Sequence, residues 1–207
     1  NVSRISINPQ TMNQETLDII GRKHTISQVV NAFNMARDCG MDNINMDFIV
    51  GLPNETEDMV KYSMEQVMKL SPDGITVHSL ALKRGSRLNM NRQKYSDLSF
   101  DNNTNLMDIT KEYAYKMGMK PYYLYRQKNM AGNQENVGYS LPGKEGIYNI
   151  LMMGDYQDVW ACGAGAVTKL ISDDRKSATR IDTLKNVDQY IDRIDEMIER
   201  KNNYFVK

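Results

Sequence analysis

The sequence is poor in cysteine, has no excess of either charge and contains no long apolar run. Two cysteines among 207 residues are too few for a disulfide scaffold, so we expect a reducing, cytoplasmic setting. They are also too few to hold an iron–sulfur cluster or a structural zinc ion alone. Lysine plus arginine equals aspartate plus glutamate at 26 each, which predicts no attraction to nucleic acid. We expect no membrane span and no signal peptide, because no apolar run approaches the required length.

The beginning of the sequence lacks an initiator methionine. The first residue is asparagine, and a strand-like run begins almost at once, at residues 2–7. A domain rarely begins with a fully buried strand unless another segment precedes it. We therefore interpret the sequence as a piece of a longer protein.

The chain as far as Leu82 alternates between strand-like and helix-like patterns. Apolar runs bounded by glycine, proline or polar turns predict strands, and apolar residues at helical spacing predict helices between them. The expected strands are residues 2–7, 44–50 and 74–82, and the expected helices are residues 14–20, 26–39 and 56–70. Such alternation favours a parallel sheet with right-handed crossovers. Polar groups near the strand ends favour an α/β barrel with a polar mouth, and hence an enzyme.

The pattern changes after Leu82. Residues 83–101 are polar and loop-like, and a helix is expected at residues 103–117. Short strand-like pieces follow, and an amphipathic stripe predicts a last helix. The strand-like pieces are residues 121–125, 148–153 and 158–161, and the last helix is residues 187–198. We place a boundary near residue 100, which gives a barrel part at residues 1–100 and a smaller α+β domain at residues 101–207.

Asp47 is the most informative candidate for a functional residue. It lies in the run NINMDFIVGLP at residues 43–53, which is typical of a buried strand that ends in a tight turn. A buried carboxylate is costly unless something satisfies it. Asp47 can hold ribose hydroxyls or an ammonium group through charge-assisted hydrogen bonds. Alternatively, it is a structural carboxylate that pairs with Arg22 or with a backbone amide, and the sequence leaves both interpretations open.

Two further candidates lie at or after the end of the first strand. Gln10 falls where ligands bind in a parallel barrel, and its amide both donates and accepts hydrogen bonds. Arg22 lies between two helices and offers a fork that fits a carboxylate. Taken alone, Gln10 is better explained as a turn residue that caps the next helix, and Arg22 as a solvated loop residue. His24 and His78 are isolated, and nothing places them with metal-ligating partners.

The second half of the sequence contains a glycine-rich segment and two polar, tyrosine-flanked segments. Small residues at 160–168 permit close approach of a ligand, or simply tight packing, and they form no dinucleotide-binding fingerprint. Residues 125–129 and 135–139 are dense in polar side chains. They are suited to gripping an anionic substrate or, alternatively, to forming an exposed hairpin loop.

Taken together, these residues resemble the oxygen-independent coproporphyrinogen III oxidases (dehydrogenases), a HemN/HemZ-like family of radical S-adenosylmethionine (SAM) enzymes. The matching motifs run in order without a gap from residue 3 to residue 81. They are residues 4–10, 21–22, 36–40, 45–53 and 71–77. Residues 125–129, 135–139 and 162–166 resemble the HemZ-type branch.

The resemblance implies the C-terminal part of a partial (β/α) radical SAM barrel, followed by a smaller domain near its mouth. By the same resemblance Gln10, Arg22 and Asp47 match SAM-binding positions, and Ala81 and Val167 match further contacts to the cofactor. The family holds a 4Fe–4S cluster with a CxxxCxxC motif that this sequence lacks. The resemblance therefore implies no metal ligand in this chain, and it implies that the chain alone is inactive and binds SAM weakly or not at all.

For the intact enzyme, the resemblance implies radical chemistry. The reduced cluster cleaves SAM to a 5′-deoxyadenosyl radical, which abstracts hydrogen from a substrate propionate, and loss of carbon dioxide and one electron leaves a vinyl group. The implied partners are a tetrapyrrole substrate and an electron donor, and we expect a monomer. Arg126 and Lys128 are hypothesised to grip the substrate carboxylates, and no catalytic residue is assigned. Two alternatives remain within the family: a haem chaperone, and a radical SAM methyltransferase that modifies haem.

Overall fold

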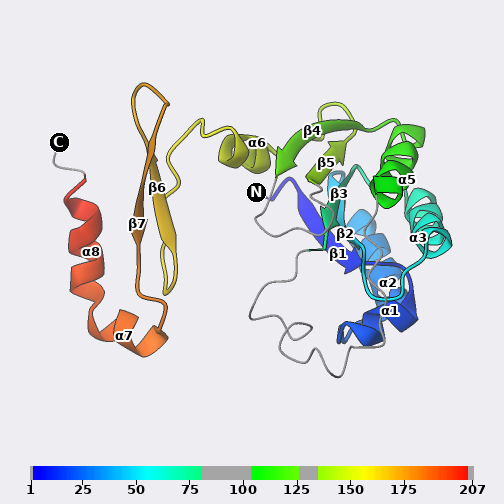
Figure 1. Ribbon diagram of the computed structural model, residues 1–207, viewed down its shortest axis with the longest axis horizontal. Helices are drawn as coiled ribbons and strands as arrows, with labels where there is room; N and C mark the ends of the chain where they lie inside the picture. The colour runs from blue at the N-terminus through cyan, green and yellow to red at the C-terminus, as the bar shows by residue number, and fades with distance from the viewer. Residues whose placement is uncertain (1, 81–103, 126–134, 205–207) are drawn as a thin grey trace. The chain divides into compact units, whose positions relative to one another are not determined.

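A computed structural model of the chain describes residues 2–80, 104–125 and 135–204. These residues form two compact units, residues 1–146 and 147–207 (Figure 1). The domain boundary expected near residue 100 falls outside the described residues. The units divide instead after Gly146, because the chain that follows the gap at 81–103 returns to the first sheet.

The first unit is built on a five-stranded mixed sheet with the strand order β1-β2-β3-β5-β4. β1 (Ile5–Gln10), β2 (Ile44–Val50) and β3 (Gly74–Ser79) are parallel, as the alternating pattern predicts. β5 (Asn136–Ser140) is antiparallel to β3, and β4 (Lys120–Tyr125) is antiparallel to β5. The predicted fold class, α/β with a parallel sheet, is confirmed for this unit, and the two added strands extend the sheet beyond its parallel part.

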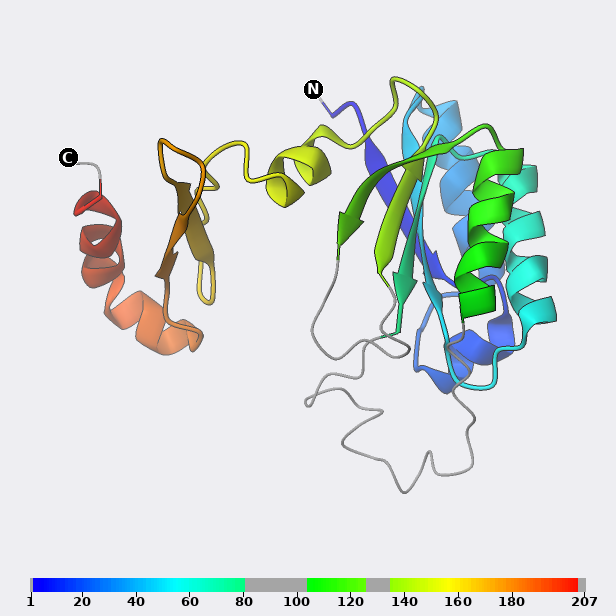
Figure 2. The ribbon, with the colours of Figure 1, turned by 45° about the horizontal axis from the view of Figure 1, so that its top comes forward.

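The helices of the first unit cover one face of this sheet. They are α1 (Gln14–Ile19), α2 (Ile26–Asp38), α3 (Glu57–Leu70) and α5 (Thr104–Lys116). Figure 2 shows α2, α3 and α5 along the same face. Phe33 of α2, Met64 of α3 and Leu106 of α5 meet Met46 and Phe48 of β2 in one hydrophobic core. The amphipathic patterns read from the sequence therefore face the sheet.

Local sequence signals fix where two of these helices begin and end. The Thr25 side chain accepts a hydrogen bond from the backbone amide of Gln28, and the Gln28 side chain accepts one from the backbone amide of Thr25. α2 therefore begins with a capping box. Thr56 caps α3 in the same position. α3 ends at Ser71, which takes a left-handed conformation with φ 54°, and Pro72 follows.

The second unit contains a hairpin and short helices. Its elements are α6 (Ile147–Met153), β6 (Val167–Ile171), β7 (Ala178–Asp182), α7 (Val187–Asp192) and α8 (Ile194–Asn202). β6 and β7 pair antiparallel, and Ile181 and Met197 are buried between hairpin and helices. The mixture of strands and helices agrees with the α+β character expected for the C-terminal part. Among the described residues, none of the helices has both the length and the apolar character needed to cross a bilayer.

Four local predictions differ from the structure. Residues 148–153 were expected as a strand but lie in α6, because a short apolar run fits either period. At residues 158–161 only Val159 makes a bridge, to Lys169. Residues 135–139, for which an exposed hairpin loop was one interpretation, fall largely within β5, which is buried throughout. The single last helix is broken at Arg193 into α7 and α8.

Candidate functional site

The face of the first sheet opposite the helices carries polar side chains, and we call it the inner face. Side chains alternate along a strand, so the core residues Met46 and Phe48 of β2 place Asn45, Asp47 and Ile49 on the inner face. The same alternation in β3, whose Ile75 and Val77 lie in the core, adds further inner-face positions. The inner-face side chains that concern us are Ser6, Asn45, Asp47, Ile49, Thr76, His78 and Tyr123.

Asp47 is held by Asn45. The Asn45 amide nitrogen donates to Asp47 Oδ1 at 2.6 Å and to Ser6 Oγ at 3.2 Å. The Asn45 amide oxygen accepts from Thr76 Oγ1 at 3.3 Å. Asn45 is only 3% exposed, and its hydrogen bonds therefore link β1, β2 and β3 while fixing one oxygen of the carboxylate. A carboxylate whose own partner is locked in this way is preorganised for a ligand.

The second oxygen of Asp47 faces His78. His78 Nε2 lies 4.0 Å from Asp47 Oδ2, which makes an ion pair only when the imidazole is protonated. Both side chains are partly exposed, at 36% and 23%. A ligand at the inner face therefore meets a carboxylate and an imidazole on adjacent strands.

Tyr123 of β4 extends the polar group of Asn45, Asp47 and Thr76 across the sheet. Burial raises the pKa of the Tyr123 hydroxyl, while a hydrogen bond with the Thr76 side chain lowers it. The Tyr123 ring covers Gly138, whose missing Cβ leaves space for it. The inner face is therefore a connected set of hydrogen-bonding groups that runs from β1 to β4.

Gln10 is the last residue of β1, which begins and ends later in the sequence than the strand expected at residues 2–7. Its Cα pairs in register with Phe48, so Gln10 and Asp47 lie on neighbouring strands near the same end of the sheet. Gln10 is 8% exposed, and its φ of 72° is a left-handed conformation that costs a residue with a side chain about 1 kcal/mol. Its amide nitrogen donates to the Asn8 carbonyl at 3.2 Å. The structure thus brings Gln10 and Asp47 to one edge of the sheet.

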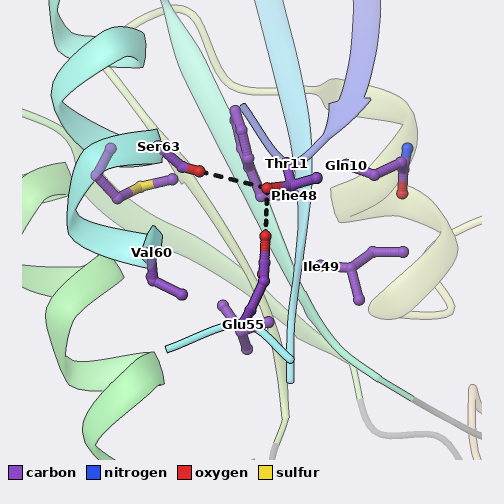
Figure 3. Close-up of a pocket in the computed structure, with 9 residues that line it drawn as sticks. Gln10, Thr11, Phe48, Ile49, Glu55, Val60 and Ser63 are labelled. Carbon is purple, nitrogen blue, oxygen red and sulfur yellow. Dashed lines mark hydrogen bonds between the residues drawn. The ribbon is translucent and has the colours of Figure 1, made fainter. Parts of the chain in front are cut away.

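A small cavity adjoins Gln10. Its volume is about 10 Å³, close to the smallest that holds one water molecule. Figure 3 shows its lining: Gln10 and Ile49 extend to one side, whereas Thr11, Glu55 and Ser63 point toward one another on the other. This second group lies on the helix side of the sheet.

The structure does not bring the other predicted site residues into contact with Asp47 or Gln10 within its described part. Arg22 is exposed in the turn after α1, and within the described part of the chain no hydrogen bond or ion pair joins it to Asp47. The partners that the structure gives Asp47 are Asn45 and His78. Val167 begins β6 in the second unit and is 39% exposed. Ala81, Arg126 and Lys128 lie outside the described residues.

Sequence reasoning missed Asn45, Tyr123 and Glu55. Asn45 had a usable signal, because it precedes Asp47 by two residues and a strand places such residues on one face. Tyr123 was assigned to a strand, but nothing local indicated that it would lie against Gly138. Glu55 had no local signal, since its partner Thr11 is 44 residues away.

Comparison with known proteins identifies the relatives of this chain. Residues 1–67 match the family model described as the radical SAM superfamily. The oxygen-independent coproporphyrinogen-III oxidase-like protein HemZ of Bacillus subtilis is 41% identical over 98% of this chain and 40% of its own length. The heme chaperone HemW of Lactococcus lactis is 33% identical over 80% of this chain and 41% of its own length.

A solved structure shares the fold. Coproporphyrinogen III oxidase (HemN) from Escherichia coli superimposes with a TM-score of 0.68 over 95% of this chain and 44% of that protein, at 20% identity. The present chain therefore spans well under half the length of the curated relatives that it matches.

The radical SAM family model matches the part of the first unit that contains β1, β2 and most of α3, and the HemN structure shares the fold of the chain. The 41% identity to HemZ over 98% of this chain, the radical SAM match and the HemN fold together support a HemZ/HemN-like radical SAM protein.

The inner face fits SAM in its donor set. A fixed carboxylate at Asp47 suits ribose hydroxyls or an ammonium group. The Gln10 side-chain amide can donate and accept hydrogen bonds with a polar group of the ligand, and the half-buried Ile49 offers an apolar contact. The described residues offer no set of ligands for an iron–sulfur cluster. Cys39 and Cys162 belong to different units, and the described residues contain no group of three or more His, Cys, Asp or Glu side chains suited to a metal ion.

Proposed function

We propose that this chain is part of a radical SAM oxidoreductase, an oxygen-independent coproporphyrinogen III dehydrogenase that converts two propionates to vinyl groups and gives protoporphyrinogen IX. The similarity to the coproporphyrinogen-III oxidase-like protein HemZ over 98% of the chain supports the substrate class. We further propose that the cluster ligands lie outside this chain, and that an electron donor serves the whole protein, which acts as a cytoplasmic monomer.

The observation that carries the proposal is that Gln10 and Asp47 lie on the adjacent strands β1 and β2, with the Asp47 carboxylate held by a hydrogen bond from Asn45. When bound, SAM supplies the radical chemistry of the family. The residues of this chain bind and orient it: Asp47 accepts hydrogen bonds from hydroxyl or ammonium groups, and Gln10 supplies its amide. The Asn45 hydrogen bonds keep the carboxylate in place without rearrangement on binding.

Replacing Asp47 by Asn tests this role. Asp47→Asn keeps the shape but removes the charge, and a lost charge-assisted hydrogen bond is expected to weaken SAM binding roughly 10- to 100-fold. The dissociation constant is measured by calorimetry on the full-length protein, reconstituted without oxygen. Asp38→Asn, at an exposed carboxylate on α2, is the matched control and leaves the constant unchanged. Equal effects of the two substitutions would contradict the assignment.

Product analysis tests the reaction. The full-length protein is incubated anaerobically with SAM, a reductant and coproporphyrinogen III. Deoxyadenosine together with a product lighter by carbon dioxide and two hydrogens per propionate supports the dehydrogenase. Deoxyadenosine without decarboxylation keeps the radical SAM class and moves the substrate elsewhere.

A haem chaperone is the second candidate. It is favoured by the 33% identity to a heme chaperone over 80% of this chain. A haem titration followed in the visible spectrum separates the two functions, because a stable complex with haem and no decarboxylated product favours the chaperone.

A further inference from the structure

Glu55 is a buried carboxyl group outside the inner face. It is 4% exposed and lies between β2 and α3. The Thr11 hydroxyl donates to Glu55 Oε1, and the Asn13 amide nitrogen lies 3.3 Å from the same oxygen. Both donors come from the segment between β1 and α1. One carboxyl group therefore ties together the two loops that follow β1 and β2.

Ser63 of helix α3 also holds this segment, and we call the hydrogen-bonded group of Thr11, Asn13, Glu55 and Ser63 the anchor. The Met12 amide donates to Ser63 Oγ at 3.1 Å, and the Asn13 side chain donates to it at 3.0 Å. The Asn13 side chain also reaches the Met59 carbonyl, at 3.1 Å. The segment after β1 is thus docked on α3 as well as on Glu55.

This anchor lies directly beside Gln10 in the chain. Figure 3 shows the Gln10 side chain extending away from the group formed by Thr11, Glu55 and Ser63. Gln10 and Thr11 are consecutive, so fixing Thr11 on the helix side fixes the direction of Gln10 on the other side. The left-handed backbone of Gln10 is unfavourable by itself and persists only where its surroundings hold it.

The carboxyl group is retained at a cost. Burial raises the pKa of Glu55, and hydrogen bonds from Thr11, Asn13 and Thr16 act in the opposite direction. The side chains that face it from the segment after β1 and from α3 (Thr11, Asn13, Thr16 and Ser63) are all uncharged. A buried, desolvated carboxyl whose partners among the described residues are uncharged is a poor source of stability, which favours a role in geometry.

We infer that Glu55 is a positioning residue for the SAM site: through Thr11 and Asn13 it holds Gln10 in the orientation that presents its amide at the carboxyl end of the sheet. This inference rests on the proposed function and adds a residue that does not itself touch the cofactor.

The test compares variants of the full-length protein. Glu55→Ala removes the acceptor, Glu55→Gln keeps an acceptor oxygen for the Thr11 hydroxyl, and Thr11→Val removes the donor while keeping the shape. Val67→Ala, in the buried core on α3, is the matched control, because it lowers stability without touching the anchor. Hydrogen–deuterium exchange of the peptide covering residues 10–16 is followed by mass spectrometry, and SAM binding is measured by calorimetry.

We expect Glu55→Ala and Thr11→Val to speed exchange in residues 10–16 but not in β2, and to weaken SAM binding roughly tenfold. Glu55→Gln restores both. Unchanged exchange in Glu55→Ala, or the same local change in Val67→Ala, overturns the inference. If the unaltered protein binds no SAM, the proposed function fails, whereas the exchange data still decide whether Glu55 holds the segment beside Gln10.

Unfolding against pH gives a separate readout. A raised pKa means that folded Glu55 binds its proton more tightly than unfolded Glu55 does. Its contribution to stability is therefore fully present at low pH and is lost as the pH rises from the ordinary glutamate range through the raised value. Glu55→Gln lacks this loss, so the stability of the variant relative to the unaltered protein increases across that window. If the difference in stability between Glu55→Gln and the unaltered protein does not change with pH, the Glu55 carboxyl is not buried, and the inference is overturned.

Discussion

At the residue scale, the inner face depends on pairs of side chains that the sequence separates widely. Asn45 and Asp47 are close in sequence, but Thr76 and Tyr123 reach them only through sheet pairing. The alternation along one strand is enough to predict Asn45 beside Asp47. The Tyr123 ring over Gly138 is not predictable in the same way, because it depends on the register of β4 against β5.

That contact leads to a prediction at Gly138. A Cβ at this position would overlap the Tyr123 ring, so Gly138→Ala is expected to destabilise the protein by about 1–3 kcal/mol through overpacking. In a Tyr123→Ala background the ring is gone, and the same substitution should cost much less. Denaturant unfolding of the four proteins of this double-mutant cycle measures the coupling. Additive effects would show that the ring does not lie over Gly138.

At the element scale, predictions succeeded where a long periodic pattern had clear end signals. The capping box of α2 and the turn after β2 gave both type and position. Short segments were less certain: residues 147–153 contain apolar groups on all sides, and nothing in them distinguishes a strand from one turn or two of helix. Val137 and Tyr139 of β5 alternate with small or polar residues, and their burial follows from neighbours that lie far away in sequence.

The capping box of α2 is testable at this scale. Thr25→Ala removes the side chain that accepts from the Gln28 amide at 3.2 Å, and loss of such a cap typically costs about 1 kcal/mol. Thr25→Ser keeps the hydroxyl and should retain most of the stability. Thermal unfolding compares the two variants, and similar melting temperatures would argue against the cap.

At the scale of the whole molecule, the two units carry different residues of the site that we propose. The parallel strands that present Gln10 and Asp47 lie in the first unit, whereas Val167 lies in the second. The curated relatives extend well beyond the matched region, since the chain covers only 40% of HemZ. The general fold and these two polar positions could be predicted from the sequence. The contact of Tyr123 with Gly138 and the hydrogen bond between Thr11 and Glu55 could not, because each joins residues that are far apart in the sequence.

We accordingly expect the isolated chain to bind SAM weakly or with no measurable heat in a calorimetric titration. The physical reason is that the contacts we propose for this chain reach only some of the polar groups of SAM, and each missing hydrogen bond to a charged group weakens binding by about 1.5–3 kcal/mol. The full-length protein is the control. Tight binding by the isolated chain would show that this chain holds a complete site.

The mixed direction of the first sheet also bears on how the chain assembles in time. β4 and β5, like β6 and β7, are neighbours in sequence as well as in space, and antiparallel hairpins of this kind close within microseconds. The β1–β2 and β2–β3 pairs are parallel, and each must wait for an intervening helix to fold back across the sheet. The β3–β5 pair joins segments that lie farther apart in the sequence still. The polar inner face therefore depends on contacts that form after the hairpins, and it is completed late in folding.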